Sequence, residues 1–176
     1  MFKLDVIYGD KVDLKPIEMD DTPNIVKWRN NPRVRKNFIF QNEFTEEMHC
    51  NWMNTKVKKQ EVIQYIIVEK ISGKSIGSIY FRDIDSYSRT AEYGIFIGED
   101  SCTGKGYGSE AAKLFIRYGF NVLSLHRIFL RVLSNNTIAY KSYLHAGFKE
   151  EGVARDFVKL NDAYYDVTFM SILETD

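Results

Sequence analysis

The chain has 176 residues, of which 44% are hydrophobic and 27% are charged, and its 24 basic residues balance its 24 acidic ones. This composition is typical of a globular protein and excludes the disordered and fibrous classes. The length suits one domain, which we expect to span residues 1–176. Because the formal net charge is zero, nothing favours nucleic acid or an anionic membrane as a partner, and we expect neither.

The opening stretch MFKLDVIYGDKVDLKPI lacks the apolar core and small-residue cleavage site of a signal peptide. No apolar run approaches the roughly 20 residues that span a bilayer. Cys50 and Cys102 lie far apart in the sequence, so we expect reduced thiols and a cytoplasmic protein. The three histidines and two cysteines show no close ligand spacing, and we therefore expect no metal site.

The first half of the chain predicts one strand, two helices and three further strands. Alternating apolar residues indicate the first strand, and a helix follows Asp21 and Thr22. Pro32 discourages continuation of that helix, and Thr45 is a cap candidate for the second one. The expected strands of this half are 11–17, 61–70, 75–84 and 89–98.

The second half predicts a glycine-rich loop, a helix, a strand, another helix and a hairpin. Asn136 is placed to cap the second of these helices and Gly147 to end it. Strands joined first by hairpins and then by a crossover imply one α/β sheet, mixed, twisted and mostly antiparallel. We expect about seven strands, with about four helices on the faces of the sheet. The expected strands of this half are 126–133, 148–160 and 164–173.

The stretch CTGKGYGSEAAKLFIRYGF places Gly104, Gly106 and Gly108 directly before an amphipathic helix. A Walker-type loop does not fit, because the glycine spacing is wrong and no Ser or Thr follows Lys105. A Rossmann fingerprint does not fit either, because Ser109 stands at its third glycine position. Two interpretations remain: a metal-free anion site built from backbone amides at a helix start, or a flexible loop that binds nothing.

Two ordered blocks carry a resemblance to a known family. Residues 103–108 fit the loop pattern Q/R-x-x-G-x-G/A except at its first position, where Thr103 stands. A second pattern, N-x-x-A-x-x-x-Y-x-x-x-G-F, is matched in full by Asn136, Ala139, Tyr143, Gly147 and Phe148. The chain therefore resembles the GNAT N-acetyltransferases, and within them the branch of the ribosomal-protein N-terminal (RimJ/RimL type) and spermidine acetyltransferases. The resemblance implies the GNAT fold, whose central strands splay apart to hold acetyl-CoA.

The resemblance also implies that acetyl-CoA is the cosubstrate and that no metal takes part. Main-chain groups of Ile95, Phe96 and Ile97 would pair with pantetheine and stabilise the oxyanion. Asn136 and Tyr143 would also contact the cosubstrate. Its diphosphate would be held by the backbone amides of Thr103, Gly104, Lys105, Gly106, Tyr107, Gly108 and Ser109.

Two residues are candidates for proton transfer. Tyr143 is the candidate acid, because a phenol with a pKa of about 10 is protonated at neutral pH and can donate to the leaving thiolate. Glu92, in the strand sequence TAEYGI, is the candidate base, and its apolar neighbours predict a raised pKa. The alternatives are a core tyrosine and a solvated edge glutamate.

The acceptor is expected to be a primary amine, for which a protein N-terminus, a polyamine and an amino sugar stay open. Arg29, Arg33 and Arg35 suit an acceptor that bears phosphate or carboxylate; otherwise they form a solvated helix end. A non-catalytic acyl-CoA-binding sensor on the same fold is the alternative to an enzyme. The family further implies a homodimer, with contact through the last strands.

Overall fold

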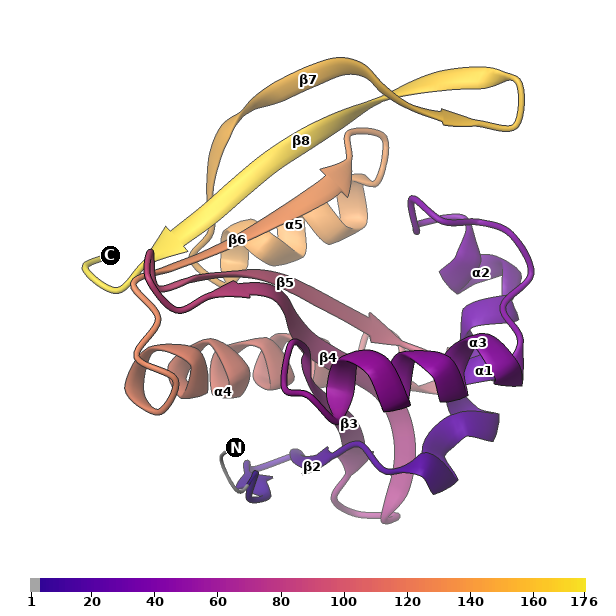
Figure 1. Cartoon of the computed structure of the whole chain (residues 1–176), viewed down its shortest axis with the longest axis vertical. Helices are drawn as coiled ribbons and strands as arrows, with labels where there is room; N and C mark the ends of the chain where they lie inside the picture. The colour runs from indigo at the N-terminus through magenta and orange to yellow at the C-terminus, as the bar shows by residue number, and fades with distance from the viewer. Residues whose placement is uncertain (1–3) are drawn as a thin grey trace.

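The computed structural model describes residues 4–176 and shows one open sheet with helices on both faces (Figure 1). Its strands lie in the order β1-β2-β3-β4-β5-β6-β8-β7. The strands are β1 (Ile7–Tyr8), β2 (Val12–Pro16), β3 (Ile63–Glu69), β4 (Lys74–Asp85), β5 (Thr90–Ile97), β6 (Arg127–Leu133), β7 (Lys149–Leu160) and β8 (Ala163–Leu173). The α-helices are α1 (Thr22–Asn30), α2 (Pro32–Arg35), α3 (Glu46–Trp52), α4 (Tyr107–Asn121) and α5 (Thr137–His145). A π-helical turn (Met53–Val57) extends α3, and two 3-10 turns occupy Met19–Asp21 and Asp100–Cys102.

Local sequence signals set several of these boundaries. The side-chain oxygens of Thr45 and Asn136 each accept a hydrogen bond of 3.2 Å from a backbone amide three residues later, which caps α3 and α5. Gly147 follows α5 with φ of +101°, a conformation that glycine adopts without a Cβ clash. These three predicted helix boundaries are confirmed.

Two elements differ from the prediction. Pro32 is expected only to stop the first helix, yet it also begins the short helix α2. Proline suits the first helical position, because the N–H that it lacks would have no partner there. The strand β1 has only two residues, too few to give an alternating pattern. The described chain therefore has eight strands and five α-helices, where about seven and four are expected.

The sheet opens between its two central strands. β5 is antiparallel to β4 along its length, from Thr90 to Ile97. With β6 it forms the one parallel pair among the described strands, through the three residue pairs that Thr90, Ala91 and Glu92 make. Beyond Glu92, residues 93–97 remain paired with β4 alone. The expected splay of the central strands is therefore present and begins at Glu92.

Helices cover the two faces of the sheet unequally. α4 packs on one face, where Phe115 stacks on Phe81 with ring centroids 4.2 Å apart. The helices α1 and α3 lie on the opposite face (Figure 1). There Trp28 of α1 and Met53 after α3 join Ile66 of β3 in a smaller core. Within residues 4–176, no helix is both long and apolar enough to span a membrane.

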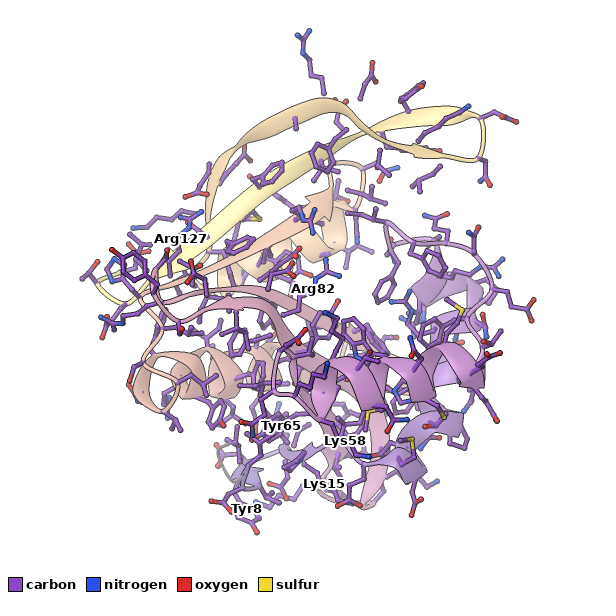
Figure 2. All side chains as sticks on the ribbon, viewed as in Figure 1. Tyr8, Lys15, Lys58, Tyr65, Arg82 and Arg127 are labelled. Carbon is purple, nitrogen blue, oxygen red and sulfur yellow. The ribbon has the colours of Figure 1, made fainter. Side chains whose placement is uncertain are left out.

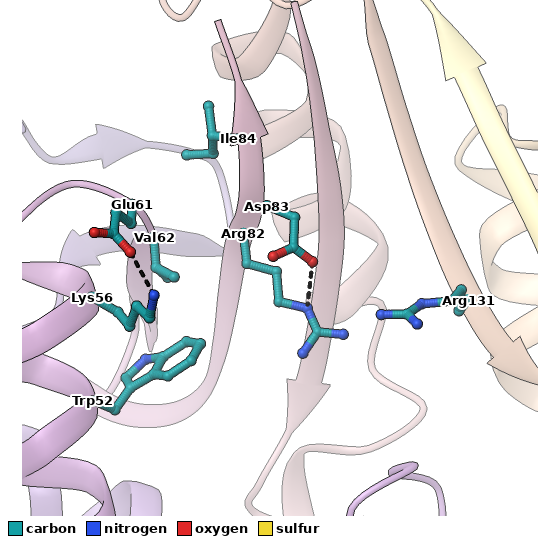
Figure 3. A pocket seen from close by; sticks show the side chains of 8 residues that line it. All are labelled: Trp52, Lys56, Glu61, Val62, Arg82, Asp83, Ile84 and Arg131. Carbon is teal, nitrogen blue, oxygen red and sulfur yellow. Dashed lines mark hydrogen bonds and ion pairs between the residues drawn. The ribbon is translucent and has the colours of Figure 1, made fainter.

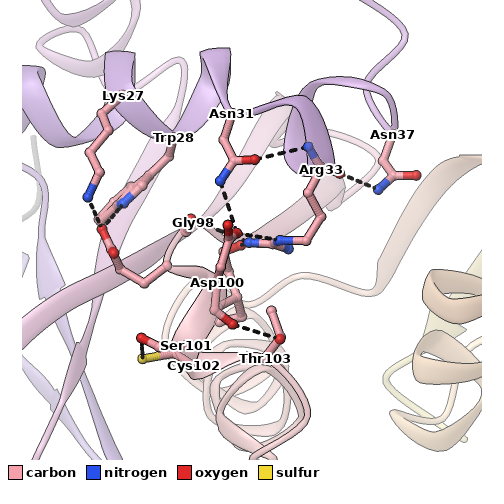
Figure 4. A network of polar contacts seen from close by, with 12 residues as sticks. Lys27, Trp28, Asn31, Arg33, Asn37, Gly98, Asp100, Ser101, Cys102 and Thr103 are labelled. Carbon is pink, nitrogen blue, oxygen red and sulfur yellow. Dashed lines mark hydrogen bonds and ion pairs between the residues drawn. The ribbon is translucent and has the colours of Figure 1, made fainter.

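A polar network ties α1 and α2 to the end of β5 (Figure 4). Glu99 accepts hydrogen bonds from Trp28 Nε1 at 2.7 Å and from Lys27 Nζ at 2.6 Å. Arg33 donates from Nε to Asp100 at 2.6 Å and from Nη2 to the carbonyl of Ile97 at 2.9 Å. These contacts fix the first helices against the segment that leads into the glycine-rich loop.

Candidate active site

The glycine-rich loop presents free backbone donors at the start of α4. Gly104 and Gly106 have φ of +73° and +83°, which favour glycine, and a Cβ added to Gly104 would meet no atom within 4 Å. Across the described residues, the amides of Gly104, Lys105 and Gly106 donate to no backbone carbonyl. Unpaired amides beside the positive end of a helix form a ready anion site, so the loop fits a diphosphate.

Side chains around the loop hold it in place. The hydroxyl of Tyr107 donates to Glu69 Oε1 at 2.5 Å and anchors the first turn of α4 to β3. The hydroxyl of Thr103 donates to the carbonyl of Asp100 at 2.9 Å, so it is engaged within the loop. The backbone amide of Thr103 donates to the same carbonyl at 3.3 Å, so the predicted amide contact of Thr103 is not available and the free N–H donors begin at Gly104.

A lysine that the sequence analysis missed lies beside the loop. Glu110 Oε1 accepts from the amides of Asp10 and Lys11 at 2.7 and 2.8 Å, and from that of Val12 at 3.4 Å. This carboxylate draws the β1–β2 turn toward α4, and Lys11 Nζ lies 3.7 Å from the position of a Cβ on Gly106. The tertiary fold thus adds a cation to the amide cradle, from a segment about 100 residues earlier in the chain.

Tyr143 lies half-buried on α5, next to the splayed strands. Its ring meets that of Tyr93 edge to face, with centroids 6.2 Å apart, and that of Phe148 at 5.9 Å. Burial raises the pKa of Tyr143, so its hydroxyl stays protonated at neutral pH and can donate. The hydroxyl of Tyr93 is buried and has no hydrogen-bond partner among the described residues.

The predicted main-chain contacts lie on the free part of β5. Ile95, Phe96 and Ile97 pair with β4 but not with β6, so one edge of this stretch faces the splay. The carbonyl of Ile97 is already used by Arg33, and the ring of Phe96 packs against Trp28. The carbonyl of Ile97 is therefore not free, whereas no bond outside the sheet engages the backbone of Ile95 or Phe96 within residues 4–176.

Glu92 is buried, with 3% of its surface exposed, and it lies between two arginines. Arg131 donates from Nε to Oε1 and from Nη2 to Oε2, and Arg82 donates from Nε to Oε2, each at 2.9 Å. Burial alone would raise the pKa of Glu92, but the hydrogen bonds from Arg131 and Arg82 outweigh it and lower the pKa. The predicted raised pKa is wrong, because the strand alternation does not reveal the two arginines. The role of Glu92 as a base stays a prediction.

The three N-terminal arginines have different environments. Arg33 is engaged in the network at the end of β5. Arg29 stacks over the ring of Phe38, 3.5 Å from its centroid, and burial lowers the pKa of Arg29 to about 10. Arg35 makes no side-chain ion pair with any residue between 4 and 176.

A pocket of about 370 Å³ opens on the face of the sheet that carries α1 and α3 (Figure 3). Arg82 projects from β4 toward it, and Arg131 reaches it from β6 (Figures 2 and 3). The sequence analysis missed both arginines, although each stands among apolar residues of a predicted strand, which is a usable signal. The lining residues are Trp52, Lys56, Glu61, Val62, Arg82, Asp83, Ile84 and Arg131.

Tyr80 lies between this pocket and the splay. It pairs across the strands with Gly94, and a Cβ on Gly94 would lie 2.3 Å from Tyr80 Cζ, so the glycine leaves room for the ring. The arginines Arg82 and Arg29 are its main electrostatic neighbours, followed by Glu92 and Arg131. No group of three or more His, Cys, Asp and Glu side chains in residues 4–176 could hold a metal ion.

Comparison with known proteins agrees with this geometry. Residues 11–149 match the family model described as an acetyltransferase (GNAT) domain. Over 98% of both chains, the protein is 28% identical to the uncharacterized N-acetyltransferase p20 of Bacillus licheniformis. It is also 28% identical to spermidine N(1)-acetyltransferase of Escherichia coli (strain K12), over 93% of this chain and 86% of that protein.

A solved structure has the same fold. Spermidine N-acetyltransferase of Vibrio cholerae in complex with CoA and spermine matches with a TM-score of 0.88 and 24% identity, over 95% of this chain and 98% of that chain. The GNAT fold, the N-acetyltransferase class and acetyl-CoA as cosubstrate are confirmed, whereas the RimJ/RimL branch is not. The chain belongs to the GNAT family of acetyltransferases.

Proposed function

We propose that this protein transfers an acetyl group directly from acetyl-CoA to a primary amine bound in the Arg82–Arg131 pocket. One observation supports this most: the glycine loop adjoins the unpaired part of β5, and Tyr143 adjoins its other end. A Cβ on Gly108 would lie 3.6 Å from Ile97 Cγ1, and the ring of Tyr143 meets that of Tyr93, the first residue beyond Glu92. A donor anchored at the loop would lie along the splay, next to a protonated phenol. Holding donor and acceptor in this way makes the reaction effectively unimolecular.

Different residues bind the cosubstrate, stabilise the oxyanion and supply the proton. The amides of residues 104–109 and the ammonium of Lys11 hold the diphosphate, and Asn136 adds a side-chain contact. A backbone amide of residues 95–97 stabilises the oxyanion that forms when the amine attacks the thioester carbonyl. Tyr143 then donates its proton to the sulfur as the carbon–sulfur bond breaks. CoA leaves as the thiol, and the acceptor leaves as an amide.

The proton of the acceptor needs a separate route. An ordinary alkylamine and an ordinary glutamate differ in pKa by about 6 units, or about 8 kcal/mol, against direct transfer. The lowered pKa of Glu92 widens that difference. We therefore assign Glu92 as a positioning residue that orients Arg82 and Arg131. The acceptor attacks as the small neutral fraction of the amine that exists at pH 7. Once the carbon–nitrogen bond has formed, the nitrogen releases its proton to solvent, and solvent returns a proton to Tyr143.

The acceptor class is the finer part of the proposal. A protein N-terminus, a polyamine and an amino sugar all carry the required amine. The related enzymes of Escherichia coli and Vibrio cholerae are named for spermidine, which supports a polyamine. CoA release from acetyl-CoA, measured with one amine of each kind, tests the activity, and turnover with none of them would contradict it.

A non-catalytic sensor for acyl-CoA is the second candidate, and Tyr143→Phe separates the two. An enzyme keeps its affinity for acetyl-CoA after this change and loses turnover, whereas a sensor shows no turnover before or after it. The hydroxyl of Tyr140 offers a matched control, because it lies on the same helix and donates to Glu150. We expect Tyr140→Phe to leave turnover unchanged.

We also propose self-association through the last two strands. Val153 and Phe157 of β7 and Tyr164 of β8 are large apolar side chains with 46 to 61% of their surface exposed. β7 is the outer strand of the sheet, so its far edge is open. A related enzyme of Vibrio cholerae is described as dodecameric. Light scattering of the purified chain distinguishes a monomer, a dimer and larger assemblies.

A further inference from the structure

The two arginines of the pocket keep most of their donors free. Each guanidinium carries five N–H donors in a fixed plane. Glu92 accepts from Arg131 Nε and Nη2 and from Arg82 Nε. Within the described chain, Arg82 Nη1 and Nη2 and Arg131 Nη1 have no acceptor. The side chains are 33% and 28% exposed, and both arginines line the pocket (Figure 3).

Glu92 itself has little capacity left for a cationic acceptor. Its oxygens already accept three charge-assisted hydrogen bonds, and its side chain is 4% exposed. One carboxylate between two guanidinium groups leaves a net positive charge there. On the strand β4, Asp83 lies 3.9 Å from Arg82 Nε and lines the same pocket, so it offsets this charge, although its 69% exposure weakens the pair.

The other charged groups that line the pocket leave no carboxylate without a partner. Lys56 and Glu61 form an ion pair at 2.6 Å on the wall that follows α3, and their charges cancel. Arg29 reaches the same region, since it is an electrostatic neighbour of Tyr80 together with Arg82. Arg29 lies over an aromatic ring, with its Nε buried and unpartnered. Lys56, Arg82 and Arg131 are thus balanced by Glu61, Asp83 and Glu92, and each of these carboxylates already has a cationic partner, so a polyamine would find no free carboxylate here.

We propose that the acceptor is a small amine that also carries an anionic group, either a carboxylate or a phosphate. The free N–H groups of Arg82 and Arg131 bind that anion, and Glu92 holds the two guanidinium planes in position. Planar, paired N–H donors match both anions, which a point charge does not. A volume of about 370 Å³ accommodates a molecule of this kind. This inference rests on the proposed acetyl transfer and names an acceptor class that differs from the polyamine for which the relatives are named.

Matched pairs of acceptors test the inference. The pairs are an amino sugar with and without a phosphate ester, and an amino acid compared with its carboxamide; spermidine is the third arm. Because a hydrogen bond to a charged group contributes about 1.5–3 kcal/mol, we expect kcat/KM to favour an anionic member by at least about 10-fold. The two pairs separate phosphate from carboxylate. A preference for spermidine or for the neutral members, with turnover present, would overturn the inference and leave acetyl transfer standing.

Substitution of one arginine locates the preference. Arg131→Lys keeps a cation near Glu92 but removes the planar fork, so the preference for the anionic member should fall by about 10-fold. Arg117→Gln removes an exposed cation from α4, on the opposite face of the sheet, and should leave the preference unchanged. An equal loss in both variants would indicate general charge steering and refute the assignment to Arg131.

A binding measurement covers the case in which no amine is turned over. Calorimetry with CoA present uses the amine-free analogue of each anionic acceptor, a sugar phosphate and a simple carboxylate. The inference requires binding of at least one analogue that weakens in Arg131→Lys and not in Arg117→Gln. Absence of binding would contradict the inference, whereas binding without any turnover would contradict only the proposed acetyl transfer.

Discussion

Replacing Glu92 by glutamine tests the buried contact on which both proposals depend. The amide has nearly the volume of the carboxylate, so Glu92→Gln changes charge and acceptor capacity without opening a cavity. Breaking a fully buried ion pair destabilises a protein by about 3–5 kcal/mol. Because Arg82 and Arg131 are 33% and 28% exposed, water compensates part of this loss. We expect the free energy of unfolding to fall by about 2–3 kcal/mol at pH 7.

The pH dependence has a defined sign. The pKa of Glu92 is lower in the folded chain, so its contribution is complete above the ordinary glutamate pKa of about 4.3. The contribution disappears as the pH falls below that value and through the folded pKa, because the carboxylate becomes protonated. Urea unfolding of the wild type and of Glu92→Gln should therefore differ at pH 7 and converge at low pH.

A matched control and a kinetic readout complete the test. Glu151 pairs with Arg127 but is 40% exposed, so Glu151→Gln should change stability by less than about 1 kcal/mol. If Glu92 positions the arginines, Glu92→Gln lowers kcat/KM by a similar factor at every pH. If it is the base, the variant loses the ascending limb of the profile. Equal stability of wild type and Glu92→Gln at pH 7 would refute the energetic reasoning.

Three further predictions concern other parts of the site and the core. Tyr143→Phe should lower kcat by about 10²–10⁴-fold in steady-state assays without changing acetyl-CoA affinity by calorimetry; an unchanged kcat would exclude Tyr143 as the acid. Gly94→Ala places a Cβ 2.3 Å from Tyr80 Cζ and should destabilise the chain by about 1–3 kcal/mol. In the Tyr80→Ala background the added methyl group has no ring to meet, so Gly94→Ala should destabilise the chain less there. If the two substitutions lower the free energy of unfolding additively in urea, the clash between them is refuted. Burial lowers the pKa of His49 from 6.5 to about 4, so stability should fall by about 3 kcal/mol as the pH drops between those values. Denaturant unfolding of the wild type and of His49→Asn across this pH range measures how much of the loss depends on His49. If the stability of both proteins falls equally with pH, His49 is not the cause.

Local signals in the sequence were sufficient for most of the fold. Caps at Thr45 and Asn136, the terminating Gly147 and the alternating runs each act within a few residues, so the chain itself displays them. The glycine loop is equally local, because its conformation depends on residues that adopt positive φ. The two blocks that resemble the GNAT family combine such local constraints in a fixed order.

The tertiary contacts of each side chain could not be predicted in this way, because its neighbours come from distant segments of the chain. Lys11 approaches Gly106 only because Glu110 binds the β1–β2 turn. Nothing near Arg33 in the sequence indicates that it bonds to the end of β5. Such contacts are set by how the helices and strands pack, and no sequence period records them.

Glu92 shows most clearly which property of a residue the sequence alone could not predict. The sequence alone showed a glutamate within a predicted strand, and its apolar neighbours predicted a raised pKa. The tertiary structure decided the chemistry, because it brought Arg82 from β4 and Arg131 from β6 to the same carboxylate. Those two contacts reversed the direction of its pKa shift. A pKa depends on all charges within a few ångströms, whatever their separation along the chain, so only the folded arrangement could determine it.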